Sequence, residues 1–186
     1  MKAEGVDVLR LSLLWIGWCA LHSLLITAKT NAWVSRRGGA VRGVSRLVYN
    51  LLATVTLVPL VWYQFSLPAE TLWAWSGPWR SLQILLLVYA AVMAVGGKRT
   101  YEMGHFLGTR QWRDYRTGHE PASLPFRTDG ALRWVRHPWY SGGIAVIWAL
   151  GPVTDVNLGP RIILSVYLVV GSLLEERKLL DEIGPA

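Results

Sequence analysis

The sequence contains little cysteine, histidine and charge, and each shortage excludes a class of protein. With one cysteine, Cys19, among 186 residues, the chain can form no internal disulfide and no cysteine-rich metal site. Its four histidines are scattered without close His-x-x-His pairs, which argues against a metal-dependent membrane oxygenase. It also has no Gly-x-Gly-x-x-Gly segment, so nothing indicates a Rossmann-type dinucleotide site.

Apolar residues are abundant instead, at 52% against 17% charged, and they are gathered into long runs. Residues 11–27, 47–67 and 81–97 carry no formal charge, and each has the roughly 17–25 residues that a membrane-spanning helix needs. Residues 138–154 form a fourth such run, and residues 162–174 form a shorter fifth one. The sequence therefore predicts one all-α domain over residues 1–186, a polytopic transmembrane bundle of about five spans whose last two form a helical hairpin.

The basic residues predict how this bundle is oriented. The loop after the first span contains Lys29, Arg36, Arg37, Arg42 and Arg46 and no acid, and residues 98–136 contain eight basic residues against four acids. Because basic residues in short loops stay cytoplasmic, we expect a multi-pass protein of the bacterial inner membrane with its N-terminus outside and its C-terminus in the cytoplasm. Attraction to anionic headgroups then accounts for the net charge of +7, so we expect membrane lipids and no nucleic acid as partners.

A cationic cluster precedes the fourth run, in the segment RHPWYSGG (residues 136–143). Pro138 suits the first turn of a helix, which would put His137 at the N-cap, near free backbone donors and the positive end of the helix dipole. With Arg136 beside it, His137 could receive an anionic group such as a carboxylate, and Tyr140 adds a ring and a hydroxyl. The alternative is an interfacial anchor, because aromatic and cationic side chains are common at that depth.

A second polar cluster, Glu175 and Glu176, ends the last run. Acids at a helix C-terminus oppose the helix dipole, so a functional reason for them becomes plausible. A carboxylate there could accept hydrogen bonds from ribose hydroxyls or from an amino group. The alternative is a solvated amphipathic tail.

Together, the two clusters resemble a known family. Arg-His-Pro-x-Tyr-x-Gly, preceded by Thr128 and Gly130 and followed by Glu175, Glu176 and Gly184, resembles the isoprenylcysteine carboxyl methyltransferases, which are integral-membrane enzymes. The segments LHSLLIT, RLVYNLL and FLGTRQ are similar to the NnrU-like and methanethiol S-methyltransferase branch of that superfamily. Where prenylcysteine-modifying relatives have a substrate arginine, this chain has Gly171, so prenylcysteine is a poor fit as substrate.

This resemblance implies an S-adenosylmethionine-dependent methyltransferase with a cytoplasmic cofactor pocket. Arg136 and His137 would be its catalytic residues and would receive the carboxylate of the cofactor's methionine part. The implied cofactor-binding residues are Phe126, Arg127, His137, Pro138, Trp139, Tyr140 and Glu175.

The acceptor is expected to be small or lipid-soluble, with a thiol favoured and a carboxylate possible. A cationic surround would help a thiol acceptor by lowering its pKa, and the candidate substrate-binding residues are His22, Arg110 and Gln111. Arg110, Arg113 and Arg116 are spaced to share one face of a short interfacial helix, where they could equally bind headgroups. His22 lies mid-span and is a functional candidate, although an interhelical hydrogen bond would also satisfy it.

Two other functions remain open from the residues. One is an NADPH-dependent membrane reductase of the sterol-reductase type, which is similar in its C-terminal region and needs no Gly-x-Gly-x-x-Gly segment. The other is a non-catalytic membrane partner or transport component, in which the basic loops dock a protein or lipid. Cofactor preference separates the first from a methyltransferase, and co-purification of a stoichiometric partner would favour the second.

Overall fold

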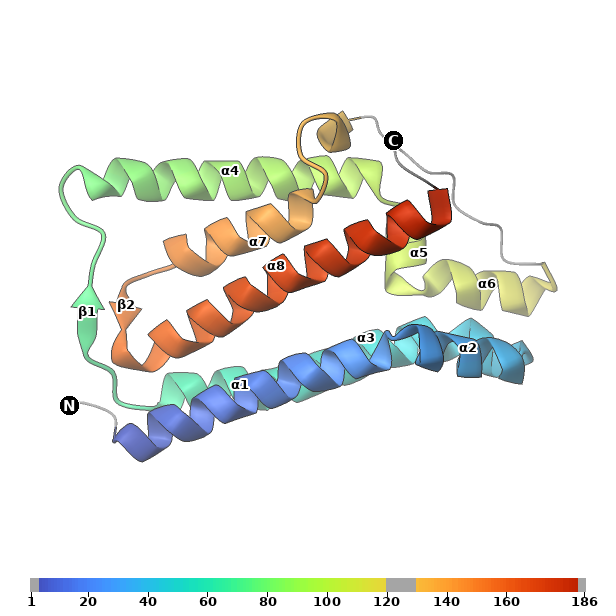
Figure 1. Ribbon diagram of the computed structural model, residues 1–186, viewed down its shortest axis with the longest axis horizontal. Helices are drawn as coiled ribbons and strands as arrows, with labels where there is room; N and C mark the ends of the chain where they lie inside the picture. The colour runs from blue at the N-terminus through green and yellow to red at the C-terminus, as the bar shows by residue number, and fades with distance from the viewer. Residues whose placement is uncertain (1–3, 120–129, 184–186) are drawn as a thin grey trace.

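The computed structural model describes residues 4–119 and 130–183, and in these residues it is almost entirely helical (Figure 1). The helices are α1 (Gly5–Leu25), α2 (Ala28–Arg37), α3 (Gly39–Ser66), α4 (Trp79–Thr100), α5 (Met103–Leu107), α6 (Thr109–Thr117), the 3₁₀ turn η1 (Gly130–Arg133), α7 (Pro138–Ala149) and α8 (Asp155–Ile183). Two short strands, β1 (Thr71–Trp73) and β2 (Val153–Thr154), complete the fold.

Four of these helices are long and apolar enough to cross a membrane: Gly5–Leu25, Gly39–Ser66, Trp79–Arg99 and Asp155–Arg177. In the most apolar 18-residue stretch of each helix, only 6–17% of the residues are buried inside the protein. Large apolar side chains such as Val58, Trp62 and Leu85 therefore face outward, which is costly in water and favourable in lipid. The prediction of an all-α polytopic membrane protein is confirmed.

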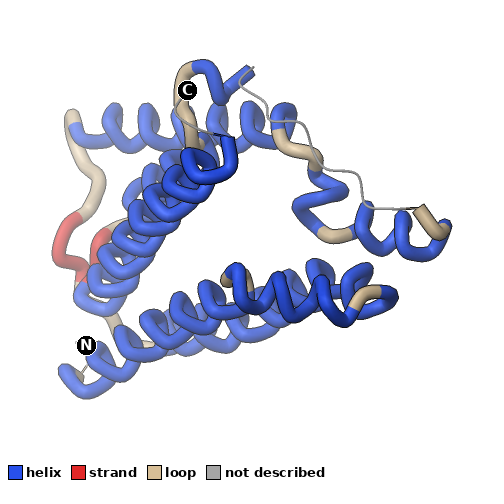
Figure 2. Tube along the Cα trace, turned by 45° about the vertical axis from the view of Figure 1, so that its right-hand side comes forward, coloured by secondary structure: helices blue, strands red, loops and turns tan. Residues whose placement is uncertain are grey.

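The long helices pack as a continuous row. Helix α1 packs against α3 on one side and α8 on the other, α8 packs against α7, and α7 packs against α4. Figures 1 and 2 show the resulting arrangement, with α1 and α3 below α8, α7 and α4. From the end of α4, the α5–α6 segment reaches back to α3, so the two ends of the row meet there.

The tight core of the row lies between α1, α3 and α8, where Leu11, Trp15, Leu60 and Val156 are buried together. The Trp15 indole donates a hydrogen bond to Gln64 Oε1 at 2.9 Å, and the Trp18 indole donates one to Thr56 Oγ1 at 3.2 Å. Polar atoms in an apolar setting are thus paired between helices, as burial requires.

The fourth predicted span differs from the observed helix. Residues 138–154 were expected to be helical throughout, whereas α7 covers Pro138–Ala149, about 18 Å at 1.5 Å per residue. Gly151 takes a positive φ of 68° and Pro152 follows it, so the helix cannot continue. The chain then extends into β2, which pairs with β1 through Thr71–Thr154 and Trp73–Val153.

The fifth predicted span, residues 162–174, lies within the much longer α8. Arg161, which seemed to limit that span, is 7% exposed and uses its guanidinium to bind the end of α7. Its Nη atoms donate to the carbonyls of Ile147, Trp148, Leu150 and Pro152 at 2.7–2.9 Å, and its Nε donates to Asn157 Oδ1 at 3.0 Å. The charge is therefore satisfied inside the helix pair, and the helix passes through this position.

Candidate active site

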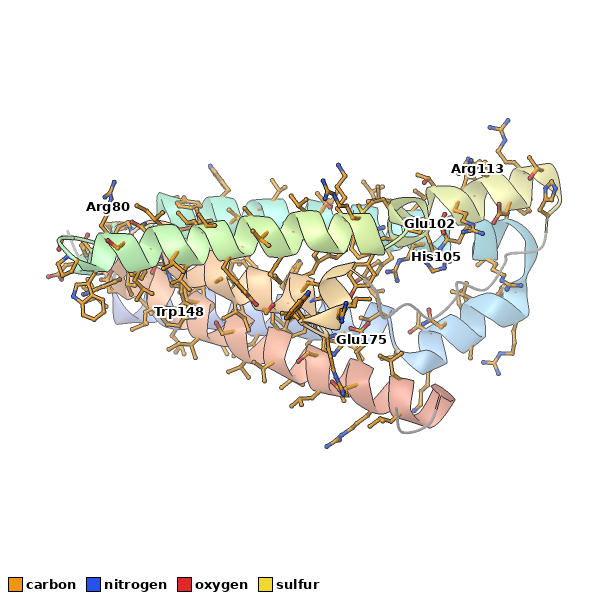
Figure 3. The ribbon with its side chains drawn as sticks, turned by 90° about the horizontal axis from the view of Figure 1, so that it is seen from above. Arg80, Glu102, His105, Arg113, Trp148 and Glu175 are labelled. Carbon is orange, nitrogen blue, oxygen red and sulfur yellow. The ribbon has the colours of Figure 1, made fainter. Side chains whose placement is uncertain are left out.

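A cavity of about 310 Å³ opens at the end of the bundle where α3, α5, α7 and α8 meet. This volume lies at the lower end of the range for ligand pockets. The residues that line it are Arg46, Tyr101, Glu102, His105, Phe106, Trp139, Tyr140 and Glu175. Figure 3 shows Glu102 and His105 beyond the end of α4 and Glu175 on α8, with Arg80 and Trp148 toward the opposite end of the bundle.

The first turn of α7 carries one wall of this cavity. His137 is the N-cap residue and Pro138 is the first helical residue, as the sequence predicts. Pro138 is fully buried and its fixed φ suits the helix start, so the turn is held rigidly. The side chains of Trp139 and Tyr140 leave this turn and line the cavity.

The Trp139 indole packs directly against the backbone of α4 at Gly97. A Cβ built on Gly97 would lie 2.0 Å from the Trp139 Nε1 atom and 2.3 Å from its Cδ1 atom, so only glycine permits this contact. The indole donates a hydrogen bond to the Ala94 carbonyl at 3.3 Å. Its ring contacts those of Tyr101 and Phe106, with centroids 4.9 and 4.8 Å away. These contacts build an aromatic side of the cavity.

His137 brings the two predicted clusters together. Its Nδ1 atom lies 3.7 Å from Glu175 Oε2, and its Nε2 atom lies 3.4 Å from Glu176 Oε2. The second contact lacks hydrogen-bond geometry, so Nε2 is a buried polar atom without a hydrogen-bond partner. Arg136 forms an ion pair with Glu176. The start of α7 and the end of α8 thus meet at one polar site, as the two motifs indicate.

The opposite wall comes from α5, which is fixed to α3. The Arg46 Nε atom donates to the Phe106 carbonyl at 3.1 Å, and Asn50 Nδ2 donates to the Leu107 carbonyl at 3.0 Å. Gly108 ends α5 with a φ of 91°, and a Cβ there would lie 2.8 Å from the Leu47 backbone nitrogen. The close approach of backbone to backbone explains why a glycine stands between α5 and α6.

Of the charged side chains around the cavity, Glu102 has an ion-pair partner and Arg46 has none among the described residues. Glu102 forms an ion pair with Arg110, which also lies 3.8 Å from Asp114. Arg46 has no carboxylate within 4.0 Å in the described parts of the chain, and its guanidinium lies over the rings of Tyr49 and Phe106 instead. Burial, and then the carboxylate of Glu175, raise the pKa of Tyr101, so its phenol stays protonated and can donate.

The predicted cofactor residues fall into three groups. Trp139, Tyr140 and Glu175 line the cavity. His137 and Pro138 lie directly behind that lining, in the same helix turn. Phe126 and Arg127 lie outside the described residues, so their assignment stays a prediction.

The predicted catalytic and substrate residues lie farther out. The side chain of Arg136 is 73% exposed and is paired with Glu176, so it is not part of the cavity lining. Arg110 and Gln111 support that lining from behind, because Arg110 pairs with Glu102 and Gln111 Nε2 donates to the His105 carbonyl at 3.0 Å. Their roles in substrate binding remain predictions.

His22 lies in a separate cluster inside the helix row. Its ring stacks on Trp18 at 5.0 Å, and the Tyr49 hydroxyl forms a hydrogen bond with it. The neighbouring Ser23 donates to the Tyr167 hydroxyl at 3.2 Å. His22 is therefore satisfied by an interhelical hydrogen bond, the alternative considered for it, and its role in substrate binding stays a prediction.

The sequence motifs identified three of the eight residues that line the cavity and missed the other five. The missed residues lie on α3 (Arg46), between α4 and α5 (Tyr101 and Glu102) and on α5 (His105 and Phe106). A signal was present, because residues 98–136 held most of the polar groups outside the spans and His105 stood among them. Their convergence on the motif depends on the turn at Gly108, which no local spacing reveals.

This arrangement can bind a small molecule that carries both a cation and polar groups. Four aromatic rings and the carboxylates of Glu102 and Glu175 surround the cavity, and such surfaces attract cations. The buried Nε2 of His137 lacks a hydrogen-bond partner, and Arg46 presents a cation to the cavity. Among the described residues, no group of three or more His, Cys, Asp or Glu side chains could hold a metal ion.

Known proteins similar to this chain include several thiol methyltransferases. Methanethiol S-methyltransferase 1 of Bradyrhizobium diazoefficiens is 28% identical over 165 residues, covering 88% of this chain and 56% of that protein. The Mycobacterium tuberculosis methanethiol S-methyltransferase is 29% identical over 169 residues, covering 88% of this chain and 66% of that protein. The methanethiol S-methyltransferase of Pseudomonas deceptionensis is 26% identical over 183 residues, covering 96% of this chain and 66% of that protein.

The chain therefore spans between about half and two thirds of the length of these relatives. No solved structure matches it. A sequence profile of the family described as NnrU protein matches residues 10–177, which includes every described residue that lines the cavity. This match confirms the branch that the segments LHSLLIT, RLVYNLL and FLGTRQ indicate. The chain belongs to the NnrU protein family.

Proposed function

We propose that this chain is a membrane methyltransferase that transfers a methyl group from S-adenosylmethionine to a small thiol. The observation that carries the proposal is the meeting of His137 and Glu175, 3.7 Å apart, at a cavity lined by aromatic rings and carboxylates. When bound, the cofactor supplies a methyl group on a positively charged sulfonium. Rings and carboxylates are the groups that hold such a cation.

The residues of α7 and α8 fit the cofactor in complementary ways. Trp139 and Tyr140 offer ring faces, and Glu175 offers a carboxylate that can accept hydrogen bonds from ribose hydroxyls or an amino group. The backbone donors at the start of α7 suit the carboxylate of the methionine part, and His137 is the N-cap residue of that turn. Alignment of donor and acceptor in a fixed cavity can supply about 7–11 kcal/mol of the barrier reduction.

A thiol acceptor is supported by the relatives and by the cavity. The similar proteins named above are methanethiol S-methyltransferases, and the cavity carries Arg46, a cation that suits a thiolate. Gly171 adds a further reason, because a Cβ there would already lie 3.0 Å from Tyr140 Cε1. A substrate arginine at this position, as in prenylcysteine-modifying relatives, would displace the Tyr140 ring.

The first prediction concerns cofactor binding by the detergent-purified protein. Isothermal titration calorimetry is expected to show binding of S-adenosylhomocysteine, and Glu175→Gln and His137→Asn are each expected to weaken it about tenfold or more. The reason is that hydrogen bonds to charged groups contribute about 1.5–3 kcal/mol. Glu70→Gln, at an exposed carboxylate beside β1 at the opposite end, should leave the affinity unchanged.

Two results would contradict this proposal. One is a wild-type protein that binds no S-adenosylhomocysteine, and the other is a Glu175→Gln variant that binds it as tightly as wild type. Binding of NADPH in place of the nucleoside would favour the membrane reductase over the methyltransferase.

We also propose that the chain crosses the membrane five times, with the cavity at the cytoplasmic face. Helix α7 together with the extended residues 150–154 makes the fourth crossing, because β2 pairs with β1 at the end of the bundle where α3 ends. Lys29, Arg36, Arg37, Arg110, Arg113 and Arg116 gather at the other end, on α2 and α6. The positive-inside rule places that end in the cytoplasm.

The second prediction tests this orientation by cysteine labelling. In a Cys19→Ala background, Glu70→Cys is expected to react with a membrane-impermeant maleimide on intact bacterial cells whose outer membrane has been opened. Arg113→Cys, on an exposed part of α6 that points away from the bundle (Figure 3), should react only after the inner membrane is permeabilised. The reverse labelling pattern would overturn the proposed orientation.

A further inference from the structure

We propose that His105 is the base that accepts the proton of the thiol acceptor, and that Arg46 stabilises the thiolate. This inference rests on the proposed function and assigns roles to residues of the cavity wall opposite the proposed cofactor residues. A thiolate is a far better nucleophile than a thiol, so a methyltransferase acting on an un-ionised thiol gains from a positioned base and a nearby cation.

The position of His105 supports this role. Its side chain lines the same cavity as Tyr140 and Glu175, but it comes from α5. Gln111 holds the His105 carbonyl, and Arg46 and Asn50 hold the carbonyls of the next two residues. The imidazole is therefore presented from a fixed backbone, as catalysis by proton transfer requires.

The charge of Arg46 is available to an incoming anion. Within residues 4–119 and 130–183, the Arg46 guanidinium forms one hydrogen bond, from Nε to the Phe106 carbonyl, and has no carboxylate partner. Glu102 is committed to Arg110, and Glu175 lies beside His137. A thiolate in the cavity would thus be the partner that the Arg46 guanidinium lacks.

The surroundings of His105 keep its imidazole ready to accept a proton. Burial is the main cause that lowers the pKa of His105, and the positive charges of Arg46 and Arg110 lower it further, against an opposing effect of Glu102. The other ionisable groups that line the cavity are Tyr101, Tyr140 and Glu175. With a pKa below its usual value of about 6.5, the side chain is neutral at pH 7.

The other candidate bases are less suitable. Glu102 is held in an ion pair with Arg110, and Glu175 lies beside His137 at the cofactor wall. His22 is hydrogen-bonded to Tyr49 inside the helix row and does not line the cavity. Among the described residues that line the cavity, His105 is the one that offers a neutral imidazole.

The step conserves atoms and charge. The acceptor sulfur forms a bond to the methyl carbon while the carbon–sulfonium bond breaks, and that bond's electron pair stays on the cofactor's sulfur. The thiol proton passes to the imidazole of His105, which later releases it to solvent. No oxidant, reductant or metal ion is needed.

The test compares wild type with His105→Gln at different pH values, using ethanethiol as acceptor. Wild-type kcat/KM is expected to be nearly constant between the pKa of His105 and that of the thiol, and to fall in acid as His105 is protonated. In His105→Gln, kcat/KM should be about 100-fold lower at pH 7 and should rise about tenfold per pH unit, because it follows the thiolate fraction. His119→Gln, at an exposed histidine, is the matched control and should behave as wild type.

A second acceptor separates ionisation from other defects. 2,2,2-Trifluoroethanethiol has nearly the size of ethanethiol but a more acidic thiol, so at pH 8 it needs little help from a base. The loss caused by His105→Gln should therefore shrink to less than about threefold for this acceptor. Calorimetry should show that His105→Gln binds S-adenosylhomocysteine as wild type does, and His105→Asn provides a second variant if the first is unstable.

The outcomes distinguish this inference from the proposed function. If wild type methylates neither thiol, the proposed function fails. If wild type methylates both, the base assignment fails when His105→Gln slows both acceptors equally. It also fails if wild-type kcat/KM for ethanethiol itself rises tenfold per pH unit up to the pKa of the thiol.

Discussion

Replacing Gly97 by alanine is expected to weaken binding of S-adenosylhomocysteine about tenfold or more, the equivalent of about 1.4 kcal/mol. The new Cβ would lie 2.0 Å from the Trp139 Nε1 atom and 2.3 Å from its Cδ1 atom, so the indole must leave its seat on α4. It would lose its hydrogen bond to the Ala94 carbonyl and its contacts with Tyr101 and Phe106. Overpacking of this kind costs about 1–3 kcal/mol in addition, so the melting temperature should fall as well.

Two further variants make the result specific. Gly17→Ala, in the middle of α1, meets nothing within 4 Å, and the higher helix propensity of alanine should stabilise the protein by up to about 1 kcal/mol. Combining Gly97→Ala with Trp139→Leu should restore the melting temperature but not the affinity, because the clash disappears together with the aromatic wall. Unchanged affinity in Gly97→Ala would show that the Trp139 indole does not shape the site.

Arg161→Met is expected to cause the largest loss of stability, about 3 kcal/mol or more. The substitution removes the guanidinium that donates to the carbonyls of Ile147, Trp148 and Leu150, and each buried unsatisfied group costs about 1–3 kcal/mol. The Pro152 carbonyl keeps a second donor, Asn157 Nδ2, at 3.0 Å. For a protein of this size, the unfolding midpoint in detergent should fall by about 6 °C or more. Differential scanning fluorimetry in a single detergent provides the measurement.

Conservative replacement tests whether geometry or charge matters at this position. Arg161→Lys keeps the charge but offers a compact ammonium in place of the planar fork, so it should recover only part of the lost stability. Arg10→Met removes an arginine whose side chain is 68% exposed and which lies 3.9 Å from Asp7; its effect should be within about 0.5 kcal/mol. If Arg161→Met unfolds at the wild-type temperature, the carbonyls find other partners.

The sequence predicts the long helices well because lipid imposes a simple rule on them. The run 81–97 falls within α4, the run 47–67 ends at the C-cap of α3, and the run 11–27 extends only two residues beyond α1. A charge-free run of that length is stable in a bilayer as a helix. The same rule fails for residues 138–154. There a glycine at positive φ and a proline end the helix early, and Arg161 provides the hydrogen bonds that make the interruption tolerable.

The site was only partly predictable for a related reason. Arg136–Tyr140 and Glu175 form local motifs whose chemistry can be recognised from residue types alone, and the structure brings His137 and Glu175 together. Arg46 and His105 carry no motif of their own. They reach the cavity because α5 packs against α3, through a backbone contact at Gly108 and hydrogen bonds to the Phe106 and Leu107 carbonyls. These contacts join residues that are far apart in the sequence, so no local motif predicts them.

The interrupted helix α7 also has a consequence for biogenesis. A segment whose helix is 12 residues long and whose Ile147, Trp148 and Leu150 carbonyls are paired by Arg161 is a poor candidate to enter a bilayer on its own. Arg161, which pairs those carbonyls, lies later in the chain and leaves the ribosome afterwards. In the five-span topology proposed above, α7 and the first turns of α8 are therefore expected to enter the lipid together.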